Sequence, residues 1–265
     1  MTRKRILNVL HKEWAVMATS LNNVLFVTLL PLLITAQALL FVWLVPRFAG
    51  ESLLQGALEK LRAALPSLEG LPAEEQFQVL LLQQFNFYLL LIPVMIAIGF
   101  ATFNIVEEKQ TRTLEPLLAT PVRTWELLLG KALSGAIPAL LITWACTGLF
   151  LLGVVSLGWG DLLGFILTPS WSVVLFLLVP AVAVLSFLLG VVGSSRAADP
   201  KSAQNIAILI VVPVLALIGV QVAGLVWFTP LLVFVLALGV WVVDLLVLRV
   251  AVHLFHRETI VVEWR

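Results

Sequence analysis

The sequence predicts an all-α integral membrane protein, and three observations support this fold class. Of the 265 residues, 61% are hydrophobic and 12% are charged, with a mean hydropathy of +1.09, whereas soluble domains carry about 25% charged residues. Apolar runs of the roughly 20 residues that a helix needs to cross a bilayer recur along the chain. These runs lack the alternation of transmembrane β-strands, so helices are the form that satisfies their backbone groups.

The apolar runs predict six transmembrane helices in one transmembrane domain, residues 1–265. Five of the runs contain a proline, which neighbouring helices can accommodate. The first run is too long for a secretory signal, so we expect an uncleaved anchor. The expected spans are residues 22–45, 86–106, 132–155, 170–193, 206–228 and 231–252.

Residues 1–20 combine basic groups with Ile6, Leu10, Trp14 and Met17 at three- to four-residue spacing. This pattern predicts an amphipathic helix in the membrane interface. A basic tail that only sets the topology is the alternative interpretation.

Basic residues are distributed unequally between the two ends of the expected bundle. Thirteen lie on the side that carries both termini and three lie on the other, so the positive-inside rule predicts cytoplasmic N- and C-termini. Residues 46–85 then form a small extracytoplasmic segment. The last two spans have almost no connector, and a re-entrant segment at 221–231 remains open.

Residues 107–131, "EEKQTRTLEPLLATPVRTWELLLGK", form the longest internal cytoplasmic connector and carry eight of the 31 charged residues. Thr113 can cap a short helix whose first turn tolerates Pro116, and Thr120 with Pro121 can begin a second helix that continues into the third span. Three leucines of the short helix would face water in an isolated chain, which favours a partner surface. They are Leu114, Leu117 and Leu118.

This connector resembles the hallmark of the ABC-2 type permeases of ATP-binding-cassette exporters: acidic residues leave the second span, "TLEPLLATPV" follows, and "ELLLGK" enters the third. Arg112 stands where that family commonly has glycine. The resemblance implies a dimeric membrane subunit in the inner or plasma membrane of a bacterial or archaeal cell. It also implies that residues 113–121, which include Glu115, bind a separate ATPase carrying ATP and Mg²⁺. Three acids could meet basic residues of that partner: Glu107, Glu108 and Glu126.

Several kinds of chemistry find no support in the residues. "WELLLGKA" lacks the first glycine and the hydroxyl residue of a nucleotide-binding loop, so we expect no ATPase activity, and hence no cofactor, in this chain. The sequence contains no cluster of cysteines and histidines that would predict a metal site, and Cys146, the single cysteine, has no partner for a disulfide. An intramembrane enzyme would need a set of convergent catalytic groups that the sequence lacks. We expect lipids, not nucleic acid, as a further partner.

Asp244 is the one acid well inside an expected span, where a charge is costly and often functional. A transport role and structural pairing both remain open for it. Gln37, Asn104 and Gln221 could line a path or join helices through hydrogen bonds. An alternative function follows from Asp244, namely a self-sufficient secondary transporter with a coupling site in the membrane. The substrate of either transporter is undetermined by the sequence.

Overall fold

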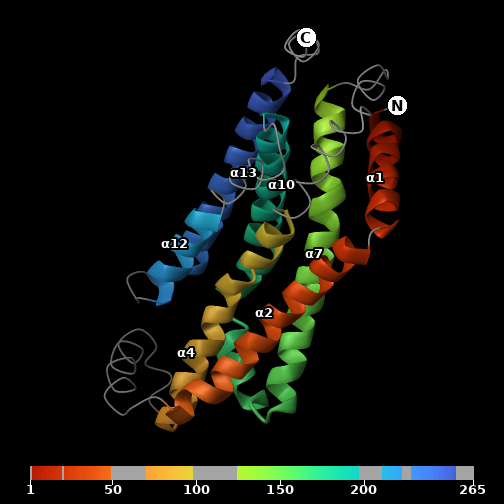
Figure 1. Ribbon diagram of the computed structural model, residues 1–265. Helices are drawn as coiled ribbons and strands as arrows, with labels where there is room; N and C mark the ends of the chain where they lie inside the picture. The colour runs from red at the N-terminus through yellow and green to blue at the C-terminus, as the bar shows by residue number, and fades with distance from the viewer. Residues whose placement is uncertain are drawn as a thin grey trace.

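The computed structural model describes residues 2–19, 21–48, 70–97, 124–196, 211–222 and 228–254, and these residues form a bundle of long helices without strands (Figure 1). The central helix is α7 (Thr124–Ser156), which contacts α1 (Thr2–Thr19), α2 (Leu21–Phe48), α10 (Val179–Arg196) and α13 (Pro230–Leu254). The other elements are α4 (Ala73–Tyr88), η2 (Gly160–Leu162), α8 (Leu163–Ile166), α9 (Pro169–Val173), η3 (Val174–Leu178) and α12 (Val211–Val222).

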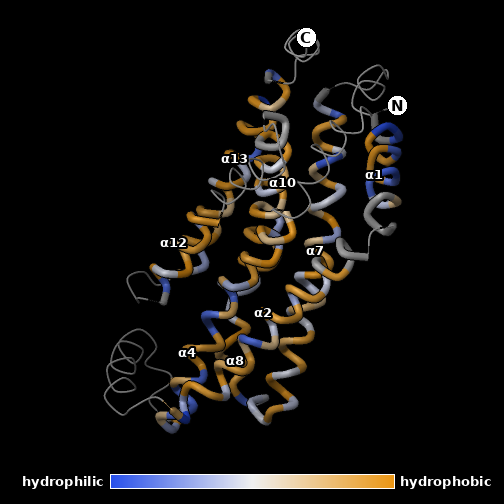
Figure 2. Tube along the Cα trace, in the orientation of Figure 1, coloured by the Kyte–Doolittle hydropathy of each residue, from blue (hydrophilic) through white to orange (hydrophobic). Residues whose placement is uncertain are grey.

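Five helical segments in the described ranges are long and apolar enough to cross a membrane: Val27–Phe48, Ala73–Ala97, Trp125–Ser156, Pro169–Val192 and Pro230–His253. Their apolar character is visible as orange along most of the bundle, whereas α1 carries much of the polar surface (Figure 2). The expected fifth span, 206–228, is described as helix only over the shorter α12. The all-helical membrane architecture is therefore present, and the count of six spans stays a prediction.

The helix expected at 86–106 begins thirteen residues earlier than the sequence indicates, at Ala73. The segment expected to be extracytoplasmic, 46–85, thus contributes its first residues to α2 and its last to α4. The amides in "EEQFQVLLLQQFNF" lower the hydropathy of this stretch, but they lie inside the bundle. Gln76 donates to the Leu71 carbonyl at 2.7 Å and Gln83 to the Phe165 carbonyl at 3.1 Å. These two amide groups find acceptors inside the bundle, whereas Oε1 of Gln84 and Oδ1 of Asn86 accept no hydrogen bond from a described residue.

A π-helical turn, η3, joins α9 to α10 within one continuous span. Pro180, the second residue of α10, has no N–H to donate to the preceding turn. The wider π turn lets the chain pass this proline without breaking the helix. Thr168 caps the start of α9 by accepting a hydrogen bond from the Trp171 N–H.

Two layers of buried side chains fix the heights of the helices relative to one another. Nearer the end at which α7 begins (the Thr124 end), Leu128, Val191 and Ala251 pack together from α7, α10 and α13. Nearer the end at which α7 finishes (the Ser156 end), two aromatic pairs form a second layer. Phe85 stacks on Phe150 with ring centroids 3.6 Å apart, and Phe87 lies 4.6 Å from Phe228. This aromatic layer joins α4 to α7 and to the start of α13.

Candidate coupling site and intramembrane polar residues

The first turns of α7 are paired with α1 along its length. Arg5 meets Glu126, Val9 packs against Gly130, and Trp14 meets Ser134. The residue numbers rise together on both helices, so α1 and α7 run in the same direction, side by side at the Thr124 end (Figure 1). Gly130 permits this approach, since a Cβ there would lie 3.0 Å from a methyl carbon of Val9. Whether α1 lies in the membrane interface stays a prediction.

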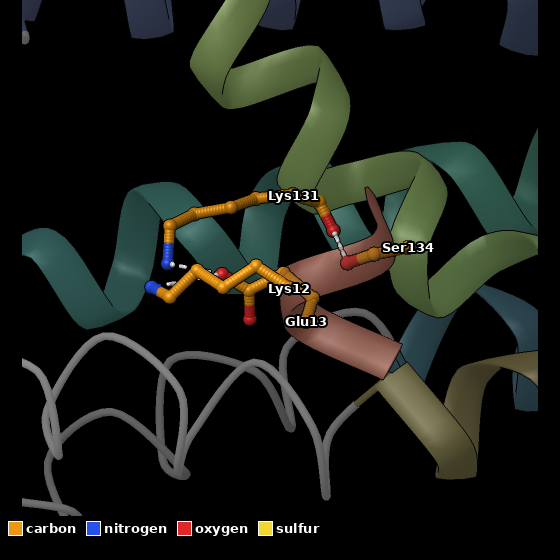
Figure 3. Close-up of polar contacts among 4 residues, drawn as sticks. All are labelled: Lys12, Glu13, Lys131 and Ser134. Atoms are coloured by element: carbon orange, nitrogen blue, oxygen red, sulfur yellow. Dashed lines mark hydrogen bonds and ion pairs between the residues drawn. The ribbon is translucent and has the colours of Figure 1, made fainter. Parts of the chain in front are cut away.

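A buried ion pair links the two helices at the centre of this junction. The Lys131 ammonium lies 3.3 Å from Glu13 Oε1, and the two side chains are 4% and 3% exposed. Lys12 approaches the same oxygen at 3.6 Å but is 44% exposed. In Figure 3 both ammonium groups point toward the Glu13 carboxylate, that of Lys131 from α7 and that of Lys12 from α1, the helix that also carries Glu13. A buried pair of this kind holds its partners strongly, because removing one charge leaves the other in poor surroundings.

Two hydrogen bonds complete the junction. The Trp14 indole N–H donates to the Ser134 carbonyl at 2.8 Å, and the Ser134 hydroxyl donates to the Lys131 carbonyl at 2.7 Å. Val9, Leu10 and Glu13 are the buried residues on the described face of α1. Leu10 and Trp14 of the expected apolar face both take part in this junction, Leu10 through burial and Trp14 through its indole N–H.

Glu126 is the one acid of the expected ATPase-binding set that the described residues include. It is almost fully buried, and its carboxylate lies 3.5 Å from the guanidinium of Arg5. The structure therefore directs this side chain toward α1 within the chain. The other connector residues lie outside the described ranges: Glu107, Glu108, Thr113, Leu114, Glu115, Pro116, Leu117, Leu118, Thr120 and Pro121.

The arrangement can transmit force mechanically. α7 continues without a break for 33 residues, a length of about 50 Å, and its first eight residues are the last eight of the connector. Its first two turns are tied to α1 by an ion pair on each side of Gly130. These ion pairs join the first turns of α7 to α1.

The intramembrane polar residues singled out by sequence do not gather at one place. Gln37 is exposed on α2, Gln221 is half-buried on α12, and Asp244 is buried on α13. Oε1 of Gln221 and both carboxylate oxygens of Asp244 accept no hydrogen bond in the described structure. Asn104 lies outside the described residues. Within the described ranges, no group of three or more metal-ligating side chains converges.

Sequence reasoning missed the Glu13–Lys131 pair and its neighbours. Glu13 is the only acid in "TRKRILNVLHKEW", and an isolated acid in a basic helix is a usable signal for pairing. Its partner, Lys131, is more than a hundred residues away and belongs to a series of basic residues that topology alone would explain.

A family model described as ABC-2 family transporter protein matches residues 7–255, almost the whole chain. The match includes most of α1, the connector and every other described helix of the bundle. No match was found among curated proteins or among solved structures. From its helical architecture and this match, the chain belongs to the ABC-2 transporter family and is a multi-pass membrane permease of an ABC transporter.

Proposed function

We propose that this permease exports its substrate from the cytoplasm, driven by ATP hydrolysis on a separate ATPase subunit that binds the 107–131 connector. ABC-2 permeases normally work with such an ATPase. In this proposal two copies of the chain form a homodimer with six spans each and cytoplasmic termini. ATP and Mg²⁺ bind to the ATPase, and the complex lies in the plasma membrane of a bacterial or archaeal cell.

The braced start of α7 is the observation that supports this function best. The last eight residues of the connector, 124–131, form the start of α7, and α7 then runs from the Thr124 end past the aromatic layer. Hinged or frayed helices would absorb a push from the ATPase. Here, ion pairs at Glu126 and Lys131 hold the receiving end to α1, so a push becomes movement of a two-helix unit.

The basic residues of the proposed cytoplasmic side provide a second line of support. α1 carries Lys4, Arg5 and Lys12, and it lies at the Thr124 end beside the first turns of α7 (Figure 1). The positive-inside rule places such an end in the cytoplasm. The ATPase, a cytoplasmic subunit, would reach the connector on this same side.

The experiment is co-purification of the ATPase with connector variants. We expect Leu117→Asp combined with Leu118→Asp to abolish ATPase association and ATP-dependent transport, because charged side chains would disrupt an apolar contact. The matched control is Leu157→Asp combined with Leu167→Asp, at two exposed leucines outside α1 and the connector, which should keep both activities. Association and transport at parental levels in the double variant would show that the connector does not bind the ATPase.

Asp244 favours a second candidate, a secondary transporter that uses this acid as its coupling site. Its carboxylate is buried in a membrane-spanning helix, which is typical of ion-coupled carriers. Vesicles that contain the purified chain and no ATPase separate the two functions. Uptake driven by a proton or sodium gradient would support the carrier, whereas flux that requires ATPase and ATP would support the exporter.

A further inference from the structure

The Pro169–Val192 span contains a break in its α-helical hydrogen bonding. Between α9 and α10 the chain forms the π turn η3, in which the Val179 N–H donates to the Val174 carbonyl, five residues earlier. Pro180 is the next residue and has no N–H. Sharp bends in helices occur mostly at prolines and at π turns. This span therefore has a defined position at which its two halves can change their angle.

The Leu175 carbonyl loses both of its helical donors at this turn. In an α-helix it would accept a hydrogen bond from residue 179, but the Val179 N–H donates to Val174 instead. In a π turn it would accept from residue 180, which is the proline. Leu175 is buried in a segment long and apolar enough to cross the membrane, so water is a poor substitute donor. A carbonyl left without a donor there is costly.

α7 supplies the missing donor through Trp144. The indole N–H of Trp144 donates to the Leu175 carbonyl at 3.4 Å. The Trp144 ring also lies 6.2 Å from the ring of Phe176, the residue that follows Leu175. The hydrogen bond is longer than the usual range of about 2.7–3.2 Å, so a small movement of one helix against the other can break it. Both rings are exposed, so they are less confined than core side chains.

We propose that Trp144 replaces the N–H that Pro180 lacks, and that it thereby sets the angle between the two halves of the Pro169–Val192 span. Trp144 acts through the Leu175 carbonyl, so it is a positioning residue. α7 contacts α10, and its first eight residues belong to the connector. Movement of α7 would lengthen this hydrogen bond and release the bend at η3. The replacement of the donor rests on these contacts, whereas its opening during the transport cycle rests on the proposed function.

The hydrogen bond can be tested by NMR on the purified full chain in detergent micelles, labelled with nitrogen-15 tryptophan. Each of the nine tryptophans gives one indole signal, and the signal missing from Trp144→Phe belongs to Trp144. Pro180→Ala restores a backbone donor to Leu175, from residue 180 in a π turn or from Val179 in an α turn.

We expect the indole proton signal of Trp144 to move upfield in Pro180→Ala, because the backbone donor competes with the indole for the same carbonyl. The control is Pro213→Ala, which changes a proline inside α12 and should leave the signal in place. A Trp144 signal that is identical in the parent and in Pro180→Ala would overturn the proposal.

Thermal unfolding provides a second measurement of the same carbonyl. Trp144→Phe keeps an aromatic ring near Phe176 but removes the N–H, so it should raise the unfolding equilibrium constant about threefold in the parent. In the Pro180→Ala background the increase should be less than about 1.5-fold, because both substitutions act on the Leu175 carbonyl and are not additive. An equal increase in both backgrounds would contradict the shared acceptor.

The role in the transport cycle can be tested on the complex with its ATPase in lipid nanodiscs. The readout is ATP turnover, which needs no identified substrate. Because the hydrogen bond opposes bending, Trp144→Phe should raise ATP turnover about threefold, and the Pro180→Ala background should remove this difference. Equal turnover in the parent and in Trp144→Phe would reject the role in the cycle, while the NMR and unfolding results retain the donor assignment. A parent chain that binds no ATPase would reject the proposed export function instead.

Discussion

The strongest quantitative prediction concerns the ion pairs of Glu13 with its two lysines. At 3.3 Å and an effective dielectric constant of about 20, the attraction between Glu13 and buried Lys131 is about 5 kcal/mol before desolvation is counted. Desolvation offsets much of this, which leaves an expected coupling energy of about 2 kcal/mol. For Lys12, at 3.6 Å but 44% exposed, the attraction in water is about 1 kcal/mol. Its expected coupling energy is below about 0.5 kcal/mol.

Double-mutant cycles test this difference. Glu13→Gln is combined with Lys131→Met in one cycle and with Lys12→Met in the other, and unfolding free energies are measured in mixed detergent micelles. The two cycles share Glu13 and differ mainly in the burial of the lysine, so each is the control for the other. Equal coupling energies in both cycles would refute the argument that burial decides the strength of this contact.

Three further predictions concern the same helices. Gly135→Ala should lower the unfolding free energy by about 1–3 kcal/mol because its Cβ would collide with Phe187. Gly148→Ala, with open space around it, should be neutral or stabilising. Equal changes in unfolding free energy would contradict the close contact between Gly135 and Phe187. Trp14→Phe should lower the unfolding free energy by about 1 kcal/mol through loss of the 2.8 Å hydrogen bond to the Ser134 carbonyl. Trp144→Phe should lower it less, because its hydrogen bond to the Leu175 carbonyl is 3.4 Å long. A larger loss of thermal stability in Trp144→Phe than in Trp14→Phe would disprove this. Arg5→Glu should reduce ATP-driven transport while the ATPase still co-purifies, because it removes the ion pair with Glu126. Adding Glu126→Arg should restore part of the transport. A double variant as inactive as Arg5→Glu would show that this ion pair does not support transport.

Composition and apolar runs were sufficient to predict an all-helical membrane protein and the positions of most of its long helices. The first expected span, 22–45, lies within α2, and the last, 231–252, lies within α13. The start of α4 was wrong because hydropathy counts an amide as polar wherever it points. The side chain of Gln83 finds its acceptor on Phe165, far along the chain, and such a tertiary partner cannot be seen in a local window.

The site was predictable to a lesser extent. Asp244 stood out as an acid within an apolar run, but the sequence did not indicate which of its neighbours faces it. Glu126 was expected to face the ATPase, and only the packing of α1 against α7 shows that it meets Arg5. The relation between Gly135 and Phe187 depends on the relative height of two helices, which no spacing rule supplies.

The aromatic layer has a consequence for leakage through the permease. Phe85, Phe87, Phe150 and Phe228 are apolar rings in close contact, and they lie between Asp244 and the Ser156 end of the bundle. A hydrated ion that passed between these rings would lose its water, which is strongly unfavourable. Movement of a hydrated solute between these rings toward the Ser156 end would therefore require α4 to separate from α7 or from Phe228.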